Sequence, residues 1–165
     1  MNQTLDVVKV GIADLNIARH PHTIMTAGLG SCVGLILYDD LKEVAGLVHV
    51  MLPDSSMARG KSYKQGKFAD TGIKSLIDLL EAEGIRSSRL KAKMAGGAQM
   101  FNLSNGSDMM KIGQRNIEAV KEQLKKYRIP IVAEDVGGHK GRTIEFLIDQ
   151  SLLNVRTVKE GVTQI

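Results

Sequence analysis

Two apolar runs separated by a short polar segment constrain the fold of this sequence most. Residues 33–38 form the first run, residues 39–42 are the polar segment, and residues 44–52 form the second run. Short runs rich in Val, Ile and Leu on either side of a polar turn are typical of a β-hairpin. The second run is apolar at nearly every position, so we expect a central strand that is buried on both faces.

This hairpin brings the only cysteine of the chain near a histidine. If the turn is symmetric about Asp40 and Leu41, Cys32 lies directly opposite His49. Directly opposed residues of antiparallel strands share one face and have Cβ atoms about 4.5–5.5 Å apart, whereas a slip by one residue places them on opposite faces. The sequence therefore predicts a thiol and an imidazole that exchange a proton, with the imidazole lowering the pKa of the thiol.

A glycine-containing turn precedes the cysteine. Gly28 and Gly30 allow the backbone to turn sharply, and such a turn leaves backbone N–H groups free to hold a developing oxyanion, which makes Gly30 and Ser31 candidates for that role. The residues alone also fit a second interpretation. A single Cys in an apolar stretch is commonly a small buried hydrophobe, and a single His in a strand is commonly a hydrogen-bonded core residue.

Composition limits the class of protein. A length of 165 residues is typical of one domain, which we place at residues 1–165, and 43% hydrophobic with 24% charged residues argues against disorder. One cysteine excludes an internal disulfide and a Cys-based zinc cluster, and a free thiol fits a reducing cytoplasm. His20 and His22 have no ligand spacing to any Cys, Asp or Glu, so we expect no metal site.

The charge pattern favours a protein partner over nucleic acid. The net charge is +4, but the basic residues are dispersed and are not interleaved with aromatic residues, so we expect no nucleic-acid binding. A mildly basic surface suits an acidic protein partner. We find no stretch of 18 consecutive apolar residues and no signal sequence, so the expected location is the cytoplasm.

Apolar periodicity predicts an α+β domain with two main helices. The helices are expected over residues 68–83, capped by Gly84, and over residues 113–127. Strands are expected at residues 7–17 in one or two pieces, and at 23–26, 33–38, 44–52, 89–94, 131–136, 143–148 and 152–157. The long segment 54–67 has no apolar periodicity, and it fits either a substrate-contacting flap or a solvated connector.

Several separated motifs carry a resemblance to a known family. The motifs are GLGSCVG (28–34), GLVHVMLP (46–53), AGGAQMF (95–101), IGQRN (112–116) and GGHKGR (137–142). Their identity and order resemble the chemoreceptor glutamine deamidases of bacterial chemotaxis, over nearly the whole chain. That family packs helices against sheets in a layered fold, so we expect a layered α/β sandwich of mostly antiparallel strands.

The resemblance also implies a catalytic set. In that family a Cys, a His and a Thr act together, and by motif position these fall on Cys32, His49 and Thr26. Thr26 would orient the imidazole through a hydrogen bond, although a β-branched residue that only fills a strand explains it as well. Met100 and Phe101 offer apolar contact surface for a substrate. His139, in a glycine-rich turn, is a rival to His49, but its expected exposure favours a surface role.

The implied activity is hydrolysis of specific glutamine side chains of chemoreceptors to glutamate, with release of ammonia and without a cofactor. The implied partners are the cytoplasmic helical domain of chemoreceptors and a chemotaxis phosphatase of the CheC type. Two alternatives remain open. One is a non-enzymatic adaptor that binds receptors and the phosphatase, and the other is a cysteine hydrolase of small amides or esters.

Overall fold

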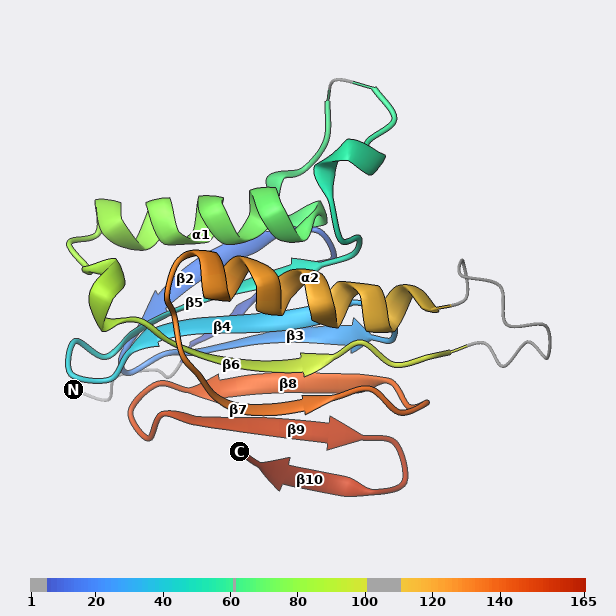
Figure 1. Cartoon of the computed structure of the whole chain (residues 1–165). Helices are drawn as coiled ribbons and strands as arrows, with labels where there is room; N and C mark the ends of the chain where they lie inside the picture. Colours follow the sequence, from blue (N-terminus) through green and yellow to red (C-terminus); the bar gives the residue numbers. More distant parts are fainter. Residues whose placement is uncertain (1–5, 61, 101–110) are drawn as a thin grey trace.

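The computed structural model describes residues 6–60, 62–100 and 111–165. Ten strands and two α-helices account for most of these residues, with three short 3₁₀ turns between them (Figure 1). The strands are β1 Val7–Lys9, β2 Leu15–Arg19, β3 Thr23–Leu29, β4 Val33–Asp39, β5 Val44–Val50, β6 Lys91–Gly96, β7 Ile131–Val136, β8 Arg142–Leu147, β9 Leu152–Thr157 and β10 Gly161–Gln164. The helices are α1 Ala69–Ala82 and α2 Ile112–Lys126.

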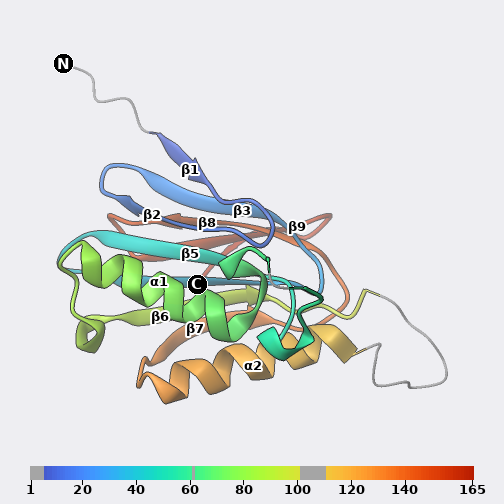
Figure 2. The same cartoon turned by 90° about the horizontal axis from the view of Figure 1, so that it is seen from above.

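The strands form two five-stranded sheets that stack face to face. One sheet has the order β2-β5-β4-β6-β7, and both helices cover its outer side, so we name it the helix-covered sheet (Figures 1 and 2). The other has the order β1-β3-β8-β9-β10, and we name it the open sheet. Most neighbouring strands are antiparallel, and only β1 with β3 and β6 with β7 are parallel among the described residues. The predicted α+β sandwich with two main helices is confirmed.

Strand β5 lies between two hydrophobic cores, as its apolar sequence predicts. Val44 and Val48 belong to the core between the helix-covered sheet and the helices. Ala45 and Leu47 belong to the core between the two sheets. Because side chains alternate along a strand, His49 faces the space between the sheets.

The first helix forms as its apolar spacing predicts. Four apolar residues of one face are buried: Ile73, Leu76, Ile77 and Leu80. The helix ends where Gly84 adopts a φ of 85°, donating to the Glu81 carbonyl at 2.9 Å while Ile85 donates to the Leu80 carbonyl at 3.1 Å. These two bonds form a Schellman motif, in which Gly84 is the glycine cap that the sequence predicts. Helix α2 begins one residue before its predicted start and ends one residue before its predicted end.

The hairpin of β4 and β5 has a different register from the predicted one. Gly34, and not Cys32, pairs with His49, because the turn contains four residues, 40–43, and is displaced by one position along the chain. A two-residue change of register keeps every side chain on its predicted face. The prediction of direct opposition was therefore wrong, while the prediction of a shared face remains compatible with the register.

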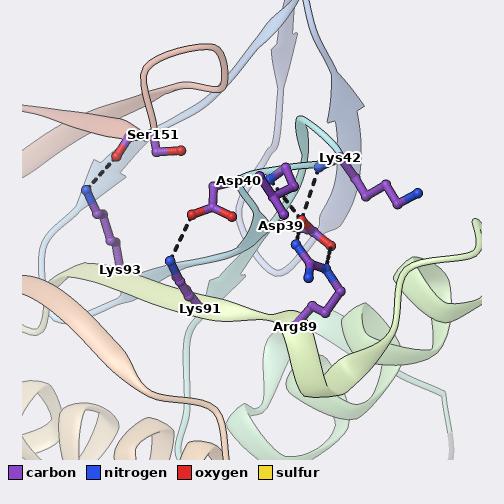
Figure 3. Close-up of polar contacts among 8 residues, drawn as sticks. Asp39, Asp40, Lys42, Arg89, Lys91, Lys93 and Ser151 are labelled. Carbon is purple, nitrogen blue, oxygen red and sulfur yellow. Dashed lines mark hydrogen bonds and ion pairs between the residues drawn. The ribbon is translucent and has the colours of Figure 1, made fainter.

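A buried aspartate explains this turn. Asp39 is 1% exposed, and its carboxylate accepts the N–H groups of Leu41 and Lys42 at 3.0 and 3.1 Å. Arg89 approaches the same carboxylate at 2.8 Å, and Figure 3 shows both sets of contacts. These bonds hold the four-residue turn, and they tie it to the segment before β6.

The chain after β9 contains a strand that the sequence did not predict. Strand β10 pairs with β9 and is exposed along its length. Its residues lack apolar alternation, which is the signal on which strand prediction depends. The segment 54–67 contains two short 3₁₀ turns, and Ser55 of the first donates to Asp70 at 2.6 Å. Its role as a flap or a connector stays open.

We expect Asp39→Asn to destabilise the protein by about 1–2 kcal/mol at neutral pH, because the amide loses the charged bond to a partly exposed arginine. The hydrogen bond from Arg89 lowers the pKa of Asp39. The stabilisation is therefore complete above the unfolded-state pKa of about 4, and it is lost as the pH falls through the lowered folded-state pKa. Urea unfolding of the parent protein and of Asp39→Asn, at neutral and at strongly acidic pH, measures the difference between their free energies of unfolding.

Asp40→Asn is the matched control. Asp40 pairs with Lys91 at 2.8 Å, but the two side chains are 39% and 44% exposed. Exposed ion pairs contribute little, so we expect a change within about 0.5 kcal/mol. Equal losses in the two variants would show that the burial of Asp39 has no special effect.

Candidate active site

The three residues of the expected catalytic set come from two sheets. Thr26 belongs to β3 of the open sheet, and His49 belongs to β5 of the helix-covered sheet. Cys32 directly precedes β4 and packs against the core between the sheets. Counted back from Gly34, it is the diagonal neighbour of His49, and in regular strands such neighbours are about 7–8 Å apart. The fold thus places all three at the same inter-sheet layer.

A hydrogen bond between the sheets fixes the imidazole. Thr26 Oγ1 lies 2.7 Å from His49 Nδ1 and 2.6 Å from the Val10 carbonyl oxygen. The hydroxyl has one hydrogen, and the carbonyl can only accept, so the hydroxyl donates to Val10. It must then accept from an N–H on Nδ1. This arrangement assigns the tautomer of His49 and leaves a lone pair on Nε2.

The other ring nitrogen of His49 is a buried base. The residue is 0% exposed, and Nε2 has no hydrogen-bond partner among the described residues. Burial lowers the pKa of His49 from an ordinary 6.5 to about 4. The imidazole is therefore neutral at neutral pH, because a charge in this layer loses its hydration. A neutral Nε2 is ready to accept a proton.

The thiol is not activated in the resting protein in the way that the sequence predicts. Burial raises the pKa of Cys32, and a contact with its own backbone N–H offsets only part of this effect. The expectation of a pKa lowered by the imidazole was wrong. The imidazole is itself neutral, so it supplies no charge that would stabilise a thiolate. In the resting protein the thiol and the base are both neutral, and no hydrogen bond joins Cys32 to His49.

Three carbonyl groups of the Cys loop, which we define as residues 30–32, are held from neighbouring elements. The Gly30 oxygen accepts from Ala98 N–H at 2.8 Å, and the Cys32 oxygen accepts from Gly97 N–H at 2.8 Å. The Ser31 oxygen accepts from the Asn116 side chain at 2.9 Å. The loop therefore has a fixed backbone.

The N–H groups of this loop differ in availability. Gly30 N–H donates to the Gly28 carbonyl at 3.1 Å, so it is engaged inside the turn. Within residues 6–60, 62–100 and 111–165, the N–H groups of Ser31 and Cys32 have no acceptor other than the Cys32 thiol itself. Of the two predicted turn residues, Ser31 is the better placed to donate to an oxyanion, and that role stays a prediction.

The glycine pair of the AGGAQMF motif permits close contact with the Cys loop. A Cβ atom on Gly96, whose φ is 112°, would lie 2.2 Å from the Cys32 carbonyl oxygen. Met100 follows this pair and is 47% exposed, and its side chain packs against Gly30. Met100 is thus beside the loop, as a substrate-contacting residue requires. Phe101 lies outside the described residues.

The remaining histidines take no part in this arrangement. His139 is exposed in the β7–β8 turn, where Nδ1 lies 3.0 Å from the Gln99 carbonyl oxygen. Among the described residues, no group of three His, Cys, Asp or Glu side chains is placed to hold a metal ion. No helix in the same residues is long and apolar enough to cross a membrane.

Asn116 is a residue that the sequence reasoning missed. It is 0% exposed in the first turns of α2, where its amide reaches the Cys loop. The sequence does contain an indication that Asn116 is buried, because it stands four residues before Val120 on the apolar face of an amphipathic helix. A polar side chain at such a position needs a partner inside the protein.

Comparison with known proteins identifies the family of this chain. Residues 51–157, more than half of the chain, match the family described as CheD chemotactic sensory transduction. The chain belongs to the CheD family. It is 58% identical over 97% of its length to a protein of Halalkalibacterium halodurans named chemoreceptor glutamine deamidase CheD, with 99% of that relative covered.

Two further relatives bear the same name. The chain is 56% identical to the protein of Bacillus velezensis, with 96% of each chain covered. It is also 56% identical to the protein of Bacillus subtilis, with 94% of this chain and 93% of the relative covered. The resemblance inferred from the motifs is therefore confirmed across nearly the full length of the chain.

The lowered pKa of His49 predicts how acid affects stability. The unfolded chain binds a proton at this residue from about pH 6.5 downward, whereas the folded protein binds it only near pH 4. The contribution of His49 to the free energy of unfolding is therefore complete above pH 6.5. It is lost as the pH falls through the folded-state pKa, by roughly 3 kcal/mol in total. We expect His49→Gln to lack this loss, so that the unfolding free energies of the two proteins converge in acid. Denaturant titrations across this pH range measure the free energy of unfolding of each protein. If the two curves of unfolding free energy against pH ran parallel, the lowered pKa would not belong to His49.

Proposed function

We propose that this chain hydrolyses specific glutamine side chains of chemoreceptors to glutamate and releases ammonia, with Cys32 as nucleophile, His49 as base and Thr26 as its orienting partner. The observation that carries the proposal is the buried imidazole, with Nδ1 bonded to Thr26 and Nε2 without a partner among the described residues. The names of the CheD relatives support the substrate and the reaction.

The unpartnered nitrogen favours catalysis over a purely structural role. A buried polar atom without a partner costs about 1–3 kcal/mol. A non-enzymatic adaptor would gain nothing from keeping such an atom in its core, whereas a base needs a free lone pair. The cost is understandable if Nε2 exchanges a proton with the thiol during the reaction.

The first half of the reaction forms a thioester. His49 Nε2 takes the proton of the Cys32 thiol while sulfur attacks the carboxamide carbon, and the carbonyl oxygen becomes an oxyanion. The N–H groups of Cys32 and Ser31 are the donors proposed for this oxyanion. The imidazolium then gives its proton to the departing nitrogen, the carbon–nitrogen bond breaks, and ammonia leaves.

The second half returns the free thiol. A water molecule attacks the thioester carbon while Nε2 takes one of its protons. The carbon–sulfur bond breaks, the imidazolium returns the proton to sulfur, and glutamate remains on the receptor. The Thr26 hydroxyl oxygen accepts a hydrogen bond from the Nδ1–H group throughout, so the imidazole keeps its orientation as its charge changes. These steps call for no cofactor or metal.

The proposed partners follow from charge and from the family. Acidic side chains on the cytoplasmic helices of a receptor would meet a protein of net charge +4 favourably. A chemotaxis phosphatase of the CheC type is the second proposed partner, and the cytoplasm is the proposed location. The adaptor and the hydrolase of small amides or esters remain the alternatives that an experiment must separate.

Incubation of the protein with purified receptor fragments, followed by assay of ammonia and mass spectrometry of receptor glutamines, tests the proposal. We expect conversion by the parent protein and none by Cys32→Ala or Cys32→Ser, because neither replacement supplies a thiolate. Both variants should stay folded, since Cys32 is only half-buried. Turnover by Cys32→Ala would remove Cys32 from the mechanism.

The same assay separates the alternatives. Binding of receptor and phosphatase without ammonia release by the parent protein would favour the adaptor. Release of ammonia from free glutamine at a comparable rate would favour a hydrolase of small amides. Receptor-dependent release alone supports the proposed substrate.

Thr26→Val retains the shape of the side chain and removes the hydroxyl. We expect activity to fall roughly 2–13-fold, the equivalent of one hydrogen bond of about 0.5–1.5 kcal/mol, or more where the ring tautomer changes. Thr26→Ser keeps the hydroxyl and should retain most of the activity. Steady-state rates with receptor fragments, together with thermal unfolding of each variant, measure the effect. A Val variant with the parent rate would make the hydroxyl structural.

A further inference from the structure

One buried side chain joins the Cys loop to the strand that bears the base. Asn116 Nδ2 donates to the Ser31 carbonyl oxygen and to the Met51 carbonyl oxygen, each at 2.9 Å. Met51 follows His49 by two residues. The amide therefore connects three segments that are distant in sequence: the loop of the nucleophile, the end of β5 and the beginning of α2.

We propose that Asn116 is a positioning residue that orients the oxyanion-donating N–H of Cys32. A peptide unit is planar and trans, so its C=O and N–H groups point in opposite directions. The Ser31 carbonyl and the Cys32 N–H belong to the same unit. By holding the Ser31 oxygen on one side, the amide of Asn116 aims the Cys32 N–H to the other side.

The neighbouring peptide units are held differently. The Gly30 carbonyl accepts from the backbone of Ala98, and the Cys32 carbonyl accepts from the backbone of Gly97. Within the described residues, the central unit of the loop is the one whose carbonyl is held by a side chain. A substitution at Asn116 can thus release this unit and leave the two flanking backbone bonds in place.

The position of Asn116 requires a side chain that donates two hydrogen bonds. Both partners of Asn116 are carbonyl oxygens, and the two hydrogens of Nδ2 satisfy them. Oδ1 has no partner among the described residues, so the position uses the donating half of the amide. The side chain is 0% exposed, which keeps bulk water from taking over the two bonds. Leu at this position supplies no donor, and Asp, which burial between two carbonyl oxygens keeps protonated, supplies one donor in place of two.

Two reactions of Cys32 separate an effect on the oxyanion from an effect on the thiol. Acyl transfer from p-nitrophenyl acetate passes through a tetrahedral oxyanion and releases p-nitrophenolate, so it needs the N–H donor. Alkylation by iodoacetamide displaces iodide at carbon and forms no oxyanion, so it reports the thiol and His49 alone. The inference rests on the proposed function, since it takes Cys32 as the nucleophile.

The experiment compares both rates in the parent protein, Asn116→Leu, Asn116→Asp and a matched control, Gln114→Leu. Gln114 is exposed on the same turn of α2 and bonds to Glu118 at 3.1 Å. We expect Asn116→Leu to lose at least about tenfold in the acyl-transfer burst, because a misdirected donor forfeits much of its contribution, and Asn116→Asp to lose less, because one donor remains. We expect their alkylation rates and pH profiles to stay near those of the parent, and the control to change neither reaction.

Other outcomes overturn the proposal. An equal fall in both reactions would show that Asn116 supports the thiol–imidazole pair in general, and unchanged acyl transfer would show that it does not act on the donor. Failure of both variants to fold would make the two bonds purely structural. A parent protein that reacts with the ester but leaves receptors unchanged refutes the proposed substrate, while the comparison at Asn116 stays valid.

Discussion

The hydrogen bond between Thr26 and His49 is the contact on which the candidate site depends, because it joins the two sheets and selects the free nitrogen of the imidazole. Close packing of the sheets makes this bond possible. Gly34 pairs with His49, and a Cβ atom on Gly34 would lie 2.7 Å from Ile144 Cδ1 and 3.4 Å from Thr26 Cγ2. A Cβ atom there would require the Ile144 side chain to move, so the glycine in β4 favours the close approach of the sheets on which the bond between β3 and β5 depends.

The sequence predicted the features that depend on periodicity and missed those that depend on loop geometry. Both helices and most strands follow from apolar spacing. The register of the hairpin does not, because the length of its turn is set by the carboxylate of Asp39 and its distant partner Arg89. Since the error was two residues, the predicted face survived it. At the site, the motifs identified Thr26 and His49, whose contact the structure shows.

The protonation state of the site was beyond the reach of the sequence for a physical reason. The pKa of a group depends on how much water the fold removes from it, and the predicted burial of the strand that bears His49 does not say how completely His49 or Cys32 is desolvated. Burial acts in opposite directions on the two, lowering the pKa of the imidazole and raising that of the thiol. Both effects favour the neutral forms, so the resting pair carries no charge.

A neutral resting pair changes what the rest of the site must do. A buried thiolate–imidazolium pair would have to overcome a desolvation cost of several kcal/mol for each ion before any substrate arrived. Here charge separation coincides with attack on the carboxamide, when negative charge moves from sulfur to the substrate oxygen. Fixed dipoles aimed at that oxygen then contribute most, because they need no reorganisation at that moment. Three carbonyls of the Cys loop are held in place by α2 and the AGGAQMF segment, and the loop is therefore suited to present its opposite N–H groups as such dipoles.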